Sequence, residues 1–265
     1  MARAPSPFPV FAVHALGLDQ HAFDPIRRFL DETRQVVPLE LLGHGNAPSM
    51  PEPALRAYVD HAIAEIAAQA PQGPVHLVGH SFGGVVAALA LARLEALGRQ
   101  VASLCLLGTP AQGGSVFLER AAAVRRDGMA TFERDTLARW FGSEPPAQWA
   151  SAIAYARAAL RRQSTDTVSS TWLALAAFPG FRGLLAAQRV LCIAAEDDLS
   201  TPPAIMAGIV DAHVPEAGTH GSVRLATLPR GGHLFPLTMA PDVAAMLQVH
   251  WEAAEAVHPP REPKE

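Results

Sequence analysis

VHLVGHSFGG, at residues 75–84, is the stretch of this chain that decides its fold. It begins as a short apolar run typical of a buried strand and passes directly into a segment with helical spacing, residues 82–97. The Gly-x-Ser-x-Gly pattern puts small residues on both sides of Ser81, as a tight strand-to-helix turn requires. We predict that this turn strains the backbone of Ser81 and lifts its hydroxyl above the end of a sheet. A helix-capping serine is the alternative, but the flanking glycines disfavour it.

Short apolar runs alternate with longer amphipathic ones on both sides of this turn. That alternation predicts an α/β fold, with one mostly parallel sheet of about six strands flanked by helices. The expected strands are residues 10–14, 35–41, 75–79, 101–108, 189–195 and 223–228. The expected helices are residues 53–70, 82–97 and 241–256. We expect strand 35–41 to lie at or near an exposed edge.

A long insertion interrupts this alternation. Between residues 113 and 187 the strand pattern disappears, and the sequence predicts several short helices. Apolar residues at helical spacing favour helix packing over a cofactor site, because that spacing alone predicts burial. We therefore divide the chain into a core of residues 1–112 and 187–265 and a helical cap of residues 113–186. A length of 265 residues suits one domain with such an insertion.

Composition excludes several classes of function. Lysine and arginine number 21 against 25 acidic residues, a formal charge of −4, so we expect no nucleic-acid partner. The only lysine, Lys264, lies in a polar tail, which excludes Schiff-base, pyridoxal phosphate, P-loop and kinase chemistry. Cys105 and Cys192 lie in apolar runs and are expected to be buried, and the Cys and His spacing predicts no metal site. We find neither a signal peptide nor a membrane span and expect a soluble cytoplasmic protein, a monomer or homodimer with no membrane partner.

A serine nucleophile needs two partners, a histidine base and a carboxylate that fixes the tautomer of that histidine. On a sheet of this kind the order along the chain is Ser, acid, His. The acidic run Glu196-Asp197-Asp198 follows an expected strand, where open α/β sheets place their sites. His233 follows the last expected strand on a glycine-rich turn. Alternation at a strand end lets only one of the three acids meet His233.

These motifs resemble those of the α/β-hydrolase superfamily over nearly the whole chain. Residues 13–19, VHALGLD, resemble the family's His-Gly oxyanion segment, and residues 42–47, LGHGNA, resemble its Gly-His-Gly-x-Ser turn. The resemblance implies a catalytic triad of Ser81, Asp198 and His233. It also implies an oxyanion hole built from the backbone N–H groups of Leu16 and Phe82. Ala15 stands where the family usually has glycine.

The insertion carries a more local resemblance. Residues 120–129 and 137–141 resemble the cap of 3-oxoadipate enol-lactonases and their esterase relatives. We expect Trp140 in the cap and His80 beside the nucleophile to contact substrate. Because the chain begins almost at its first strand, we also expect the two N-terminal strands that usually form one sheet edge to be missing.

The sequence therefore predicts a cofactor-independent serine hydrolase that cleaves a small carboxylic ester or lactone through an acyl-enzyme. Two alternatives use the same scaffold: a C–C hydrolase, lyase or cofactor-free haloperoxidase with the same triad, and a non-enzymatic receptor for small molecules. Between residues 119 and 162 the cap has eight arginines and five acidic residues. We expect it to favour an anionic substrate, such as a carboxylate-bearing enol-lactone, over a neutral analogue, with a preference that weakens as ionic strength rises.

Overall fold

The computed structural model describes residues 8–185, 189–213 and 221–257. At its centre lies a six-stranded sheet in which every neighbouring pair of strands is parallel. The strands are β1 (Val10–Val13), β2 (Val36–Leu39), β3 (Val75–His80), β4 (Val101–Leu107), β5 (Arg189–Ala195) and β6 (Ser222–Leu228). Their order, β2-β1-β3-β4-β5-β6, puts β2 at one edge, as the sequence predicts.

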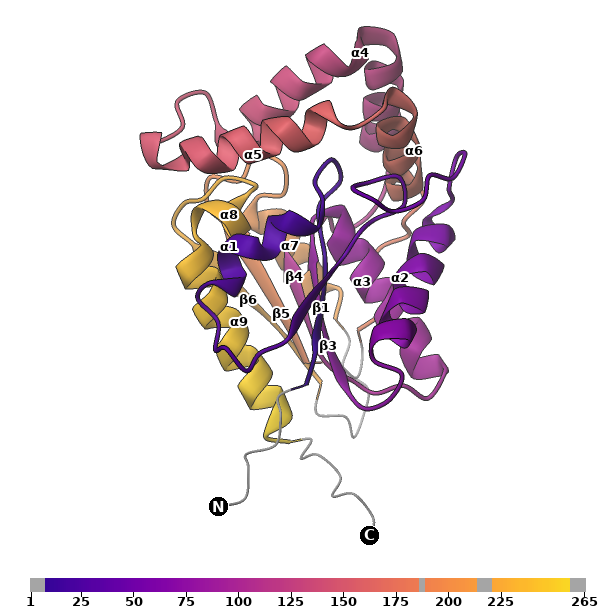
Figure 1. Ribbon diagram of the computed structural model, residues 1–265, viewed down its shortest axis with the longest axis vertical. Coiled ribbons are helices and arrows are strands. Elements are labelled where there is room, and N and C mark those ends of the chain that lie inside the picture. Colours follow the sequence, from indigo (N-terminus) through magenta and orange to yellow (C-terminus); the bar gives the residue numbers. More distant parts are fainter. Residues whose placement is uncertain (1–7, 186–188, 214–220, 258–265) are drawn as a thin grey trace.

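Helices cover both faces of this sheet, so its central strands are buried throughout (Figure 1). One face packs against α2 (Leu55–Gln69), α3 (Phe82–Ala96) and α7 (Pro203–Asp211). The other face packs against α1 (Asp24–Arg27), α8 (Phe235–Thr238) and α9 (Ala240–Glu255). A short 3-10 helix, η1 (Gln20–Phe23), precedes α1.

Alternate residues of each strand enter opposite apolar clusters, because successive side chains of a strand point to opposite faces. In β1, Phe11 and Val13 join the cluster under α2 and α3, whereas Val10 and Ala12 join the cluster under α9. Cys105 and Cys192 are fully buried in this arrangement, as predicted.

The predicted long helices agree with α2, α3 and α9 to within two residues at each end. The sequence reading missed α7 and the short helices η1, α1 and α8. Each of these is short, and α7 follows Pro202 and begins with Pro203, a pair that reads as a loop although proline is tolerated in a first helical turn.

In the described part of the segment between β4 and β5, helices are the only regular secondary structure. They are α4 (Ser115–Phe141), η2 (Ala147–Trp149), α5 (Ala150–Arg161) and α6 (Thr165–Ala176), and all four lie within the predicted cap of residues 113–186. Figure 1 shows α4, α5 and α6 together above one end of the sheet. Apolar side chains of the cap belong to the same two clusters as the sheet, so the division into two domains stays a prediction.

Within the described ranges, no helix combines the length and apolarity needed to cross a membrane. Lys264 and its predicted tail lie outside the described residues, as do residues 1–7 of the N-terminal segment.

Candidate active site

The turn between β3 and α3 holds Ser81 in an unusual conformation. Its φ of 54° and ψ of −121° lie where side chains are rarely tolerated, as predicted for a strained turn. A Cβ on Gly79 would lie 2.3 Å from the Gly83 carbonyl oxygen, so the turn can close only with glycine there. The Ser81 N–H donates to the Leu107 carbonyl at 2.8 Å and ties the turn to β4.

His233 is held by one contact of its imidazole and two contacts of its main chain, each with a different part of the chain. Its Nδ1 lies 2.9 Å from Asp198 Oδ2. Its backbone N–H donates to the Trp140 carbonyl at 2.8 Å, which joins the histidine loop to the end of α4. Its own carbonyl oxygen lies 2.9 Å from His80 Nε2. With Nδ1 donating to the carboxylate, Nε2 is left to accept a proton.

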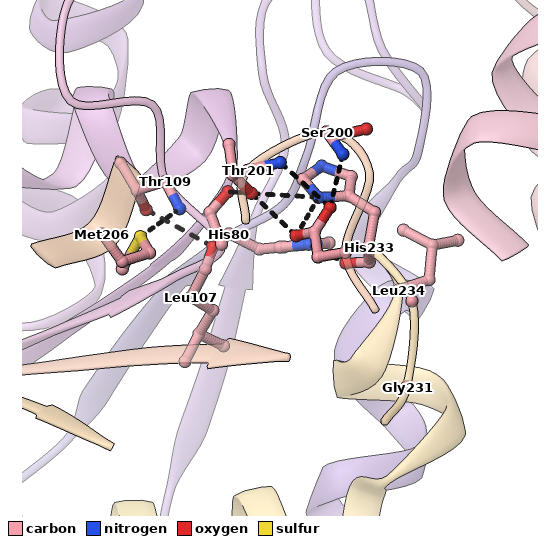
Figure 2. Close-up of polar contacts among 12 residues, drawn as sticks. His80, Leu107, Thr109, Ser200, Thr201, Met206, Gly231, His233 and Leu234 are labelled. Atoms are coloured by element: carbon pink, nitrogen blue, oxygen red, sulfur yellow. Dashed lines mark hydrogen bonds and ion pairs between the residues drawn. The ribbon is translucent and has the colours of Figure 1, made fainter. Parts of the chain in front are cut away.

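Asp198, rather than a neighbouring acid, meets His233. Its other oxygen, Oδ1, accepts hydrogen bonds from the N–H groups of Ser200 at 2.7 Å and Thr201 at 3.0 Å. The Thr201 hydroxyl lies 2.8 Å from Oδ2, and Figure 2 shows Ser200 and Thr201 beside His233. Asp197 instead accepts the Gly232 N–H at 2.8 Å, so it holds the loop that carries the histidine.

These contacts keep the Asp198 carboxylate ionised in a buried position. Burial raises the pKa of Asp198, but the nearby imidazole of His233 and the hydrogen bonds from His233 and Thr201 outweigh it and hold the pKa well below its usual range. The side chain is therefore an acceptor at neutral pH and favours the His233 tautomer with a proton on Nδ1.

Ser81 and His233 line one narrow cavity, with a volume of about 20 Å³, between the sheet and the cap. Leu16 and Thr201 also line it, and Trp140 lines it from the cap, where we expected a substrate contact. The Ser81 hydroxyl makes no hydrogen bond with another described residue, and such bonds often tighten only when substrate binds. The cavity adjoins a groove of about 740 Å³ that shares Ser200 and Thr201, which gives room for part of a substrate.

The two backbone groups expected to form an oxyanion hole lie next to this serine. Phe82 is the first residue of α3, where N–H groups lack a partner within the helix, and Leu16 lines the cavity. Neither N–H donates to another described residue. A Cβ on Gly83 would lie 2.2 Å from the Val13 carbonyl oxygen, so this glycine lets α3 approach the end of β1, which Leu16 follows closely.

His14 orients the peptide unit that carries the Leu16 N–H, a role that sequence reasoning missed. Its Nδ1 lies 2.9 Å from the Ala15 carbonyl oxygen, and its Nε2 accepts the Leu41 N–H at 3.1 Å. Because the Ala15 carbonyl and the Leu16 N–H belong to one peptide plane, a hydrogen bond to the first restricts the direction of the second. Burial lowers the pKa of His14 to about 4, so the ring stays neutral.

His80 is buried beneath the loop that carries His233. Its side chain is 1% exposed and bonds the His233 backbone, and it is absent from the described lining of the cavity. Burial and the neighbouring His233 lower its pKa to about 3, so the neutral ring donates from Nε2 to the His233 carbonyl. The side chain of His80, at the end of β3, lies in the core beneath the histidine loop, and its contact with substrate stays a prediction.

No three His, Cys, Asp or Glu side chains gather into a metal-binding group in the part of the chain that the structure describes.

Comparison with known proteins identifies the family. Residues 10–246 match the profile of the Alpha/beta hydrolase family, so this chain belongs to that family. A pimeloyl-[acyl-carrier protein] methyl ester esterase from Neisseria meningitidis is 35% identical over 97 residues, which are 37% of this chain and 34% of that protein. The chain thus spans about a third or less of the length of the first curated relatives it matches.

Solved structures with the same fold are similar over almost the whole chain. An esterase from Thermogutta terrifontis has a TM-score of 0.79 at 21% identity, covering 94% of this chain and 91% of its own. The enol-lactonase from Burkholderia xenovorans LB400 has a TM-score of 0.79 at 19% identity, covering 94% of each chain. These similarities show the α/β-hydrolase fold.

Proposed function

We propose that the protein is a cofactor-independent serine hydrolase that cleaves a small carboxylic ester or lactone. The observation that carries this proposal is the Asp198–His233 hydrogen bond of 2.9 Å beside a strained serine that lines the same cavity. The esterase and lactonase names among the similar proteins favour an ester bond over other bonds.

The reaction proceeds in two halves. In the first, His233 Nε2 takes the proton of Ser81 as its Oγ attacks the carbonyl carbon, and the N–H groups of Leu16 and Phe82 stabilise the oxyanion. The tetrahedral intermediate expels the alcohol oxygen, which His233 protonates, and an acyl-enzyme remains. In the second, His233 activates a water that releases the acid and restores Ser81.

The neighbouring groups have positioning roles in this scheme. Asp198 keeps the proton on Nδ1 of His233, and His80 and the Trp140 carbonyl hold the histidine main chain. His14 holds the peptide that presents the Leu16 N–H.

A substrate panel tests the proposal and its alternatives. Wild-type protein and Ser81→Ala are compared on short aryl esters, lactones and vinylogous diketones. We expect wild-type turnover of esters or lactones and a loss of 10³-fold or more in Ser81→Ala, as is usual for triad members. Turnover confined to the diketones would indicate C–C cleavage, and binding without turnover would indicate a receptor.

A further inference from the structure

Two arginines of α4 differ from the other charged residues of the cap. Most cap arginines form ion pairs at the surface, such as Arg126 with Asp127 and Arg161 with Glu133. Arg120 and Arg139 form no ion pair with a described residue, and both line the cavity that contains Ser81. The basic character of the cap therefore reaches the candidate site through these two side chains.

A kink in α4 brings the two arginines together. They stand 19 positions apart, which in a straight helix would separate them by about 28 Å. Gly128 breaks the helix with a φ of 77° and a ψ of 170°, a conformation essentially restricted to glycine. The two halves of α4 thus contribute one arginine each to the wall of a single small cavity.

This wall contains hydrogen-bond donors that lack acceptors. Arg139 Nε and Trp172 Nε1 are buried without a partner among the described residues, and Arg139 otherwise reaches only the Thr136 hydroxyl at 3.3 Å. The Arg120 guanidinium lies 5.1 Å from the ring centre of Trp172, on which it packs. Guanidinium and indole groups can only donate, so a ligand that satisfies them must accept.

The nearby acids do not neutralise this wall. Asp127 and Asp135 line an adjoining cavity of about 170 Å³, but they pair with Arg126 and Arg134. Asp198 is bonded to His233. Burial and the charge of Arg120 lower the pKa of Arg139 to about 10, which still leaves it positively charged at neutral pH.

We propose that Arg120, Arg139 and Trp172 form a subsite for a carboxylate of the substrate, so that the enzyme prefers half-esters of dicarboxylic acids, or carboxylate-bearing lactones, to their neutral analogues. The inference rests on the proposed function, which places the scissile carbonyl at Ser81. The guanidinium fork matches the two oxygens of a carboxylate, and the shared cavity places that group near the serine.

The test compares pairs of esters that differ by one charge. Rates are measured for the monomethyl and dimethyl esters of succinate, glutarate and adipate, with wild-type protein and Arg139→Gln, Arg139→Lys and Arg120→Gln. We expect wild-type kcat/KM to favour at least one monomethyl ester, and Arg139→Gln to reduce that preference by about 10- to 100-fold, as for a lost hydrogen bond to a charged group. The loss should fall mainly on KM, because the carboxylate is bound in ground and transition states alike.

Arg126→Gln is the matched control, because Arg126 lies on the same helix but pairs with Asp127 at the surface. It should keep the wild-type preference. Raising the ionic strength should weaken the preference, as the sequence predicts, but only in part, because partly buried charges are screened less than those at a cavity mouth. A preference that salt abolishes and that Arg139→Gln and Arg120→Gln leave unchanged would overturn the subsite.

Covalent labelling of Ser81 by a fluorophosphonate separates failure of the subsite from failure of the proposed function. Normal labelling of Arg139→Gln shows an intact site, and glutarate should slow the labelling of wild-type protein. If wild-type Ser81 is labelled but glutarate gives no protection and the esters show no charge preference, the subsite is refuted alone. If Ser81 is unlabelled and neither ester is cleaved, the hydrolase proposal fails, and the subsite fails with it.

Discussion

Replacing Asp198 by asparagine should disable the base without changing the shape of the site. Oδ1 of Asp198 accepts two backbone N–H groups, from Ser200 and Thr201. An asparagine must keep its carbonyl oxygen on those donors, which turns its NH₂ group toward His233 Nδ1. That nitrogen then has to accept, so the proton moves to Nε2, and His233 can no longer take the proton of Ser81.

The expected loss is large, because the tautomer and the charge change together. A wrong tautomer in a Ser-His-Asp triad costs about 10⁴-fold in kcat, equivalent to about 5.5 kcal/mol. The assay is steady-state turnover of the best ester or lactone from the panel, with circular dichroism to verify folding.

Asp197→Asn is the isosteric control for this experiment. Among the described residues, the Asp197 carboxylate accepts only the Gly232 N–H, at 2.8 Å, and an asparagine oxygen can accept the same bond. We expect its kcat to stay within about tenfold of wild type, since one hydrogen bond to a charged acceptor contributes roughly 1.5–3 kcal/mol and most of it is kept. Equal losses in the two variants, or a greater loss in Asp197→Asn, would refute the assignment of the acid.

Three further predictions concern stability. The pKa of His14 is lowered to about 4 and that of His80 to about 3, so below pH 6.5 these histidines take up protons in the unfolded chain but not in the folded one. The free energy of unfolding, measured in urea, should therefore fall by about 2 kcal/mol per histidine between pH 7 and pH 5. A free energy of unfolding that does not change with pH would contradict this. Tyr155→Phe removes a 2.8 Å hydrogen bond from α5 to Asp19 and should lower Tm by about 2–4 °C in a thermal scan, whereas an unchanged Tm would mean that this bond does not hold the cap. Gly84→Ala places a Cβ 2.0 Å from a buried threonine hydroxyl and should lower the free energy of unfolding in chemical denaturation by about 1–3 kcal/mol. An unchanged free energy of unfolding would show that the turn has room for the methyl group.

The sheet and its long helices could be predicted because their apolar patterns are local. Strands buried on both faces give nearly continuous apolar runs, as at residues 101–107, and no distant contact is needed to recognise them. Ser81 and Asp198 follow two such runs, whereas His233 follows the less buried strand at residues 222–228 and was found from its glycine-rich turn and its place in the chain order. Parallel strands place their carboxyl ends at one edge, so residues far apart in the sequence were expected to meet there.

Other parts of the site depend on contacts that leave no sequence signal. The Trp140 carbonyl that holds His233 is a main-chain atom, and any residue could supply it. His80 and His14 look like ordinary strand-end histidines until the distances to the His233 and Ala15 carbonyls are known. These positions could be listed from the sequence, but their roles could not.

The sequence also does not show which cap arginines line the cavity. Charge counting identified a basic cap, but it gave Arg126 and Arg139 equal weight. The conformation of Gly128 decides which arginines enter the cavity, and a glycine within a helical pattern does not by itself reveal a positive φ.

The most direct test of the central claim is to locate the nucleophile. Wild-type protein and Ser81→Ala are treated with a fluorophosphonate, and the adduct is measured by intact mass and assigned by peptide mapping. We predict a single adduct on Ser81 in wild-type protein and none in a folded Ser81→Ala, which should also lose ester turnover. An adduct on another residue, or ordinary ester turnover by Ser81→Ala, would contradict the account.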